Sequence, residues 1–154
     1  DKEINQLKRQ QIFKVIRKRV NDLLTENFSE KIIIMGDFND TPTNSDLIEE
    51  LNTRAKQEEV IGKELFNPMV GLQSYKRGSL IFKKQWMLFD QQLFSKSFLQ
   101  HQSNLEYVKT AIFDADFLKN PGGKSGGFPF RTFVGGKYFG GYSDHFPVFT
   151  ILKY

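Results

Sequence analysis

One stretch of the sequence, KIIIMGDFND at residues 31–40, joins a predicted strand to a group of polar side chains. Residues 31–35 form a short, mostly apolar and β-branched run, which predicts a strand buried on both of its faces. Gly36 interrupts this run, and Asp37, Phe38 and Asn39 follow it directly. Ligands of open α/β sheets bind outside the carboxyl ends of the strands, so these residues lie where an active site is expected.

Asp37 and Asn39 are two residues apart, which lets both side chains point the same way while Phe38 turns back into the core. A carboxylate can accept a proton or approach a metal ion, and an amide NH₂ can donate to a negatively charged oxygen. Asp and Asn also stabilise turns by bonding to the backbone, so an ordinary turn is an equally good interpretation of this stretch alone.

Length and composition restrict the class of protein. The chain has 154 residues, which is enough for one domain with a sizeable core. No apolar run approaches the length of a membrane span. Cysteine is absent, which excludes disulfides, thiol nucleophiles and thiolate metal sites. A net charge of +4 mildly favours anionic partners such as phosphate esters or nucleic acid.

Two helices are expected near the start of the chain. Apolar residues recur at helical spacing over residues 2–26, and the basic residues between them are interpreted as the solvent-exposed face. This helix followed by the strand at 31–35 forms half of a βαβ unit, for which no preceding parallel strand is found. A second helix is predicted to begin with Thr41 as its N-cap and Pro42 as its first residue.

A β-hairpin is predicted from residues 79–82 and 86–95, joined by a turn at residues 83–85. Its second strand contains Asp90. Because Asp is depleted in strands, Asp90 needs either a place in solvent or a partner, and the sequence pattern favours neither.

The last third of the chain contains a glycine-rich segment at residues 119–141, interpreted as a mobile loop that borders the site and carries Arg131 and Lys137. It is not a phosphate-binding P-loop, because the required spacing before a helix is missing. Asp144 and His145 follow it at the mouth of a final strand, which is predicted over residues 148–152. His101 lies among Gln and Ser residues and is interpreted as a surface histidine.

Three motifs occur in order along the chain: GDFN at residues 36–39, WMLFDQ at residues 86–91 and SDHFP at residues 143–147. In this order and with these separations they resemble the endonuclease/exonuclease/phosphatase superfamily. That group includes deoxyribonuclease-like nucleases, abasic-site endonucleases, sphingomyelinases and inositol polyphosphate phosphatases. The residues flanking the first and last motifs resemble a bacterial branch of it, and the resemblance runs from about residue 12 to residue 152.

The resemblance implies an α/β fold, a two-sheet sandwich with four αββα layers in the complete domain, and phosphoester hydrolysis with Mg²⁺ or Mn²⁺. It implies that Asp37 orients or deprotonates the attacking water and that Asn39 donates to the phosphoryl oxygens. His145 would contact the phosphate with Asp90 as its carboxylate partner, and Asp144 would lie beside the metal. Asp37, Asn39 and Asp144 are then expected to line one crevice.

In that superfamily an early Asn, a metal-binding Glu and usually another His lie N-terminal to the region matched here. We therefore expect residues 1–154 to be the C-terminal half of the domain, with the N-terminal half absent. The missing half or another chain would cover the inner face of the sheet. The metal site, and hence activity, would be incomplete without it.

The leading functional hypothesis is a metal-dependent phosphoesterase acting on nucleic acid, a phospholipid head group or a small phosphate ester. The alternative is a non-catalytic module on the same fold that binds anions or nucleic acid. Retention of Asp37 and Asp90, which a binding module does not need, favours the hydrolase. The glutamate that cannot be located favours the alternative.

Overall fold

The computed structural model describes residues 2–73, 76–100 and 104–154, and it has the mixed α/β fold that the sequence predicts. His101, interpreted above as a surface residue, lies outside the described residues. The helices and strands are, in chain order, α1 (Lys2–Glu26), β1 (Ile33–Asp37), α2 (Ser45–Leu51), β2 (Thr53–Arg54), β3 (Leu65–Phe66), α3 (Met69–Leu72), β4 (Leu80–Phe82), β5 (Gln85–Met87), β6 (Asp90–Ser95), β7 (Glu106–Ile112), β8 (Phe133–Val134), β9 (Lys137–Tyr138) and β10 (Val148–Lys153).

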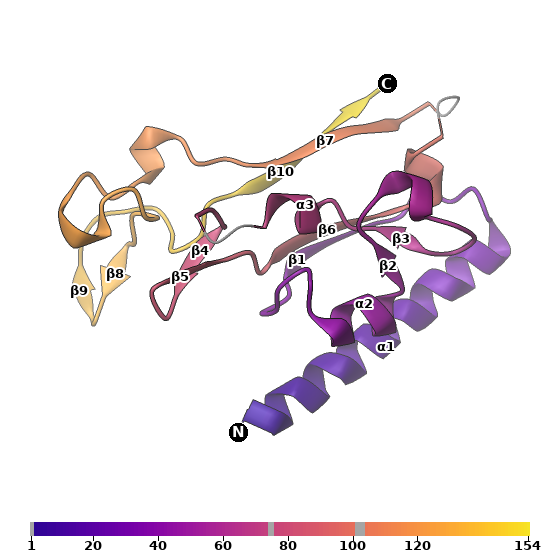
Figure 1. The fold of residues 1–154 in the computed structure, drawn as a ribbon, viewed down its shortest axis with the longest axis horizontal. Coiled ribbons are helices and arrows are strands. Elements are labelled where there is room, and N and C mark those ends of the chain that lie inside the picture. Colours follow the sequence, from indigo (N-terminus) through magenta and orange to yellow (C-terminus); the bar gives the residue numbers. More distant parts are fainter. Residues whose placement is uncertain (1, 74–75, 101–103) are drawn as a thin grey trace.

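The central sheet has four strands in the order β1-β6-β3-β2. β6 pairs antiparallel with both β1 and β3, and β2 pairs parallel with β3. β7 and β10 form a separate two-stranded antiparallel sheet, which is the long ribbon at the top of Figure 1. The two short hairpins, β4–β5 and β8–β9, both lie at the left-hand end of the molecule in Figure 1.

Apolar side chains on the two faces of the central sheet determine which elements pack against it. On one face Leu65 and Leu93 join residues of α1 and α2 in a buried cluster. The next residue along each strand, Phe66 and Phe94, points to the opposite face and packs near Tyr107 of β7. The sheet therefore lies between the two helices and the β7–β10 ribbon.

The prediction that the first strand is buried on both faces was wrong. Ile34 packs toward the helices, but Ile33 and Met35 on the other face are 38% and 69% exposed. β1 is the end strand of its sheet, and no segment in the described ranges covers its second face. The strand also begins two residues later than predicted and continues through Gly36 to Asp37, because both residues pair with β6.

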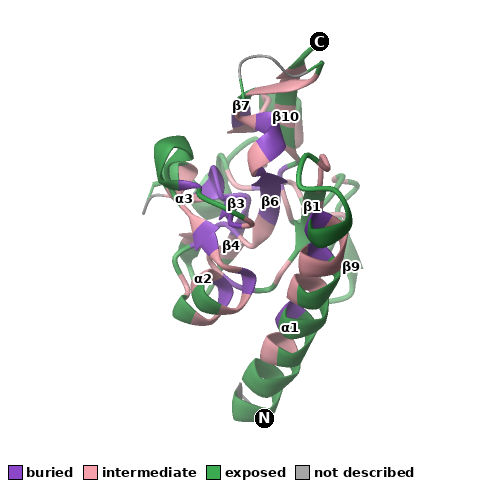
Figure 2. Ribbon diagram, turned by 90° about the vertical axis from the view of Figure 1, so that its right-hand side faces the viewer, coloured by how far each residue is buried: buried purple, intermediate pink, exposed green. Residues whose placement is uncertain are grey.

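Helix α1 has the predicted bounds, but its buried stripe is narrower than its apolar pattern suggested. Phe13, Val20 and Leu24 are buried at the interface with the sheet and α2. Four apolar residues are more than half exposed: Ile4, Leu7, Ile12 and Val15. The first turns of α1 project beyond the sheet, so they have little to pack against (Figure 2). Neither α1 nor another helix in the described ranges has the length and apolar character needed to span a membrane.

Helix α2 begins later than predicted, because Asn44 and not Thr41 is its N-cap. The side-chain oxygen of Asn44 accepts a hydrogen bond from the backbone N–H of Asp46 at 2.7 Å, which satisfies one of the free donors of the first turn. Thr41 instead accepts a turn hydrogen bond from the N–H of Asn44.

The predicted second strand of the hairpin is divided into two. Lys83 and Lys84 form a two-residue turn with positive φ angles of 49° and 65°, so Gln85 already pairs with Phe82. The chain then leaves the hairpin after β5 and joins the central sheet as β6. This division takes Asp90 out of the hairpin and places it at the start of a strand beside β1.

We predict that Leu93→Ala destabilises the domain by about 2–5 kcal/mol, since Leu93 is fully buried between α1 and α2 and truncation leaves a cavity. Chemical denaturation followed by circular dichroism measures the change. Leu7→Ala is the matched control: Leu7 is 59% exposed on α1, and we expect a change within about 0.5 kcal/mol. Equal losses in the two variants would contradict the described core.

Candidate active site

The first part of the candidate site is the pairing of Asp37 with Asp90. Asp37 is the last residue of β1 and Asp90 is the first residue of β6, and the antiparallel register makes them direct partners across the sheet. Directly opposed residues of an antiparallel pair carry their side chains on the same face. The two acidic residues, 53 positions apart in sequence, therefore share one edge of the sheet.

The second part is the contact between Asp90 and His145. Nδ1 of His145 lies 2.8 Å from Oδ2 of Asp90, so the predicted contact between these side chains is present. Only 19% of the Asp90 side chain and 22% of the His145 side chain are exposed. The carboxylate therefore has the partner that an acidic residue in a sheet needs.

Ser79 is a third member of this group, and the sequence analysis did not identify it. Its side chain is fully buried, and its hydroxyl donates a hydrogen bond to the same Oδ2 of Asp90. Its backbone carbonyl accepts the N–H of Phe146 at 2.6 Å, and the next residue, Leu80, forms a β-bridge with His145. Ser79 thus binds Asp90 through its side chain, and its backbone helps to hold the chain that carries His145.

A weak sequence signal for Ser79 exists in its neighbour Gly78. A Cβ atom on Gly78 would lie 2.1 Å from the carbonyl oxygen of Met87, so no larger residue fits without moving backbone. This close approach packs the chain just before β4 against the last residue of β5, three residues before Asp90. The pair Gly78-Ser79 alone, however, resembles many turns, because both residue types are common in them.

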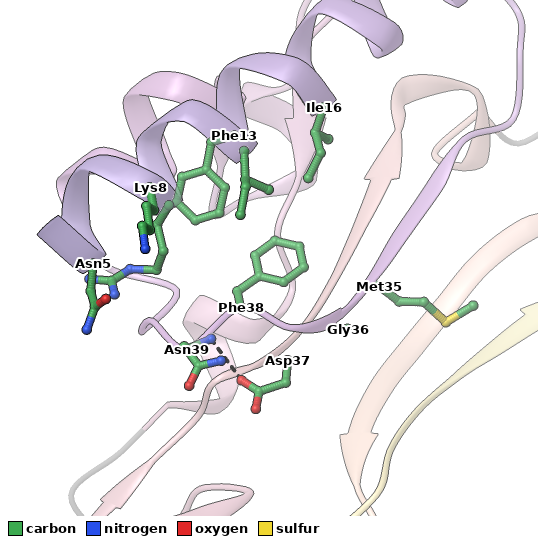
Figure 3. A pocket seen from close by; sticks show the side chains of 11 residues that line it. Asn5, Lys8, Phe13, Ile16, Met35, Gly36, Asp37, Phe38 and Asn39 are labelled. Carbon is green, nitrogen blue, oxygen red and sulfur yellow. Dashed lines mark hydrogen bonds between the residues drawn. The ribbon is translucent and has the colours of Figure 1, made fainter.

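Asp37 and Asn39 lie together in a tight turn after β1. Oδ1 of Asp37 accepts the backbone N–H of Asn39 at 2.8 Å, and Asn39 has a positive φ of 51°. The side-chain to backbone hydrogen bond that is expected of a turn is therefore present at this stretch. Phe38 points back toward Phe13 of α1, with ring centroids 5.9 Å apart, whereas Asp37 points the other way (Figure 3).

The same turn borders a cavity of about 540 Å³ between α1 and the end of β1. Asp37, Asn39, Lys8 and Arg9 are among the residues that line it. Figure 3 shows Lys8 on α1 and Asp37 and Asn39 at the end of β1. The sequence analysis assigned the basic residues of α1 to the solvent-exposed face, and the structure places these two beside the acidic end of β1. Their proximity to Asp37 depends on how α1 packs on the sheet, which the helical pattern does not encode.

Asp40 fixes the position of this turn. Its Oδ2 accepts a charge-assisted hydrogen bond from Nε of Arg9 at 3.2 Å, and its Oδ1 accepts the N–H of Thr41 at 2.9 Å. Its backbone carbonyl accepts the side-chain amide of the buried Gln91 at 3.3 Å. The chain after Asn39 is therefore anchored to both α1 and β6.

Asp144 lines a second cavity, of about 420 Å³, and its Oδ2 lies 3.9 Å from Nη2 of Arg131. Its chain neighbour His145 contacts Asp90, which lies opposite Asp37. That Asp37, Asn39 and Asp144 line one crevice stays a prediction. Arg131 lines the second cavity, whereas Lys137 lies on the exposed β9, 5.4 Å from the centroid of the Phe139 ring.

The acidic residues near the candidate site are the side chains that could bind a metal ion. Within the described ranges no group of three or more His, Asp or Glu side chains is placed to hold one ion. Oδ2 of Asp90 is engaged by Ser79 and His145, and Asp144 is directed toward Arg131.

The chain was compared with models of known protein families, with curated proteins and with solved structures. A family model described as Endonuclease/Exonuclease/phosphatase family matches residues 2–154. The chain belongs to this family. Members of the endonuclease/exonuclease/phosphatase family are generally phosphoesterases or nucleases and typically depend on divalent metal ions. Membership indicates a hydrolase of phosphoester bonds. No curated protein and no solved structure matches the chain.

We predict measurable coupling between Asp90 and His145 in a double-mutant cycle on stability. Asp90→Ala, His145→Ala and the double variant should give an interaction energy of about 1–2 kcal/mol in chemical denaturation, because the two side chains share one partly buried contact.

The matched control is the Lys18–Asp22 ion pair on α1. Its N–O distance is 2.9 Å, close to that of Asp90–His145, but its side chains are 78% and 46% exposed. Its coupling should stay below about 0.5 kcal/mol. A coupling for Asp90–His145 no larger than that of the control would refute the contact.

Proposed function

We propose that this domain hydrolyses a phosphoester bond by metal-assisted attack of water, with Asp37, Asn39, Asp90 and His145 as its site residues. The main support for the proposal is that three segments far apart in sequence meet: Asp37 lies opposite Asp90, and Asp90 contacts His145. These residues come from the three motifs shared with the family. Their convergence on one sheet edge supports a common chemical task.

Asp37 is proposed to orient or deprotonate the attacking water. Its Oδ1 is engaged by the N–H of Asn39, whereas its Oδ2 accepts no hydrogen bond from the described part of the chain. The side chain is exposed at the end of β1, where water reaches it. The internal hydrogen bond holds the carboxylate in one orientation, so the turn and the proposed catalytic role are compatible.

Asn39 and His145 are proposed to bind the phosphoryl oxygens. The Asn39 carboxamide is exposed beside Asp37 and supplies N–H donors. In His145, Nδ1 faces Asp90, which leaves Nε2 as the ring atom available to the substrate. An Nε2–H of this ring would donate to a phosphate oxygen while Asp90 holds the ring in position through Nδ1.

A divalent cation, Mg²⁺ or Mn²⁺, is proposed as the cofactor. It would polarise the phosphoryl oxygen and offset developing charge. Asp144 is the proposed ligand from this chain, together with a glutamate that would come from an N-terminal half of the domain. The exposed second face of β1, with Ile33 and Met35, supports a covering segment from that half or from another chain.

We predict that Asp37→Asn, in a polypeptide that carries the whole site, lowers turnover by about 100- to 10,000-fold, the usual effect of losing a general base. Hydrolysis of bis(p-nitrophenyl) phosphate with Mg²⁺ or Mn²⁺ measures it. Asp116→Asn is the control, since the Asp116 side chain is fully exposed and pairs with Lys119. Unchanged hydrolysis in Asp37→Asn would reduce Asp37 to a turn residue.

We also predict that the 154-residue chain alone hydrolyses phosphate esters at or near the background rate with either metal, because a glutamate ligand of the metal is proposed to come from the N-terminal half of the domain. Activity equal to that of a longer polypeptide containing the upstream half would contradict the proposed division of the site. A longer polypeptide that binds phosphate esters but hydrolyses none with either metal would favour the non-catalytic binding module.

A further inference from the structure

The second cavity, which has no part in the chemistry described above apart from Asp144 at its border, has the size of a small-molecule site. Its volume is about 420 Å³. Ligand-binding pockets are typically about 300–1,000 Å³. It lies between the β4–β5 hairpin and the chain from Asn120 to Phe139, which includes the β8–β9 hairpin. Figure 1 shows these segments at the same end of the molecule.

The cavity begins one residue away from the candidate site on each of two segments. Leu80 forms a β-bridge with His145, and the residues beside them, Ile81 and Asp144, both line the cavity. Leu80 is buried against the core, and the alternation of side chains along a strand turns Ile81 to the other side. A phosphate bound at His145 would therefore lie close to the mouth of the cavity.

Backbone hydrogen bonds fix the aromatic wall of the cavity. The N–H of Phe130 donates to the carbonyl of Leu118, and its carbonyl accepts the N–H of Tyr142, both at 2.8 Å. The carbonyl of Phe128 accepts the N–H of Asn120 at 2.8 Å. A Cβ atom on Gly141 would lie 2.0 Å from the Phe130 carbonyl oxygen, so this close approach requires glycine. The wall thus exists before a ligand binds.

The lining combines aromatic rings with positive charge. Phe128, Phe130 and Phe139 present three rings to the cavity, and Lys84 and Arg131 supply two cations. Lys84 has no ion-pair partner in the described part of the chain, and Arg131 contacts Asp144 only at 3.9 Å. Asn120 and Ser125 add hydrogen-bonding groups between the rings.

We propose that this cavity binds a planar aromatic group covalently attached to the substrate phosphate, either a nucleobase or an aryl group. Aromatic rings contact each other favourably edge-on or offset, and Asn or Ser side chains can pair with the polar edge of a base. Lys84 and Arg131 then attract the phosphate of the same molecule. The proposal rests on the proposed function, because that function is what places the phosphate of the substrate at His145.

Other phosphate esters fit the lining less well. A choline head group is a cation, and Lys84 and Arg131 would repel it although the rings could otherwise attract it. An inositol polyphosphate needs several donors where the cavity presents three phenylalanine rings. An acyl chain would bury Asn120 and Ser125 without hydrogen-bond partners, which is unfavourable.

Trp86 provides a direct binding measurement, because it is the one tryptophan of the chain and its ring contacts Phe128 edge-on, with centroids 5.5 Å apart. The 154-residue chain is titrated in EDTA with adenosine monophosphate, phenyl phosphate, phosphocholine and glycerol phosphate, and Trp86 emission is followed. We expect the two aromatic esters to bind at least about 10-fold more tightly than the other two.

Two pairs of variants locate the ligand. Phe139→Ala should weaken binding of the aromatic esters about 10-fold, since each stacked ring contributes about that factor. Phe133→Ala on the same hairpin is its control, because Phe133 is 58% exposed and does not line the cavity. Lys84→Gln should weaken the binding of adenosine monophosphate but not the binding of adenosine. Lys83, the neighbouring residue of the turn, does not line the cavity, so Lys83→Gln should change the binding of neither ligand.

The proposal is overturned if phosphocholine or glycerol phosphate binds as tightly as the aromatic esters, or if Phe139→Ala and Phe133→Ala behave alike. Because the titration contains no metal and involves no hydrolysis, its result is separate from the catalytic test. Binding without hydrolysis in the longer polypeptide would refute the proposed function and leave the aromatic site standing. Hydrolysis without preference for aromatic esters would refute the aromatic site alone.

Discussion

The antiparallel pairing of β1 with β6 is the constraint on which the candidate site depends. Asp37 ends one strand and Asp90 begins the other, so the register alone makes them neighbours. A slip of one residue would place Asp37 opposite Gln91 and turn one set of side chains to the other face. The alternate burial of Leu93 and Phe94 on opposite faces opposes such a slip, because it would expose both clusters. The packing of the core therefore determines the geometry of the site.

Asp90 links this pairing to the rest of the domain. One carboxylate oxygen accepts hydrogen bonds from Ser79, at the start of β4, and from His145, just before β10. A largely buried carboxylate is costly unless donors satisfy it, so these contacts stabilise the arrangement as well as define it. Ser79 strengthens it further, because its backbone carbonyl holds the chain next to His145.

A polar network places the final strand beside the sheet. The Gln92 side chain accepts a hydrogen bond from the Thr150 hydroxyl and donates to the carbonyl of Val148, and Thr150 also contacts Thr110 of β7. Gln92 and Asp90 are two residues apart on β6 and share a face. The same face of β6 thus positions both β10, through Gln92, and His145, through Asp90.

The sequence by itself determined the mixed α/β class, the long first helix and the order of the three motifs. It left open whether Asp90 lies in solvent or has a partner. These features depend on local periodicity and residue chemistry, which a single chain segment carries. Only the tertiary structure decided that Ser79 and His145 both contact the Asp90 carboxylate and that Asp144 lies near Arg131. It also decided that residues 86–95 divide between two sheets. Strand register, burial and shared cavities arise from contacts between residues far apart in sequence, and no local pattern specifies them.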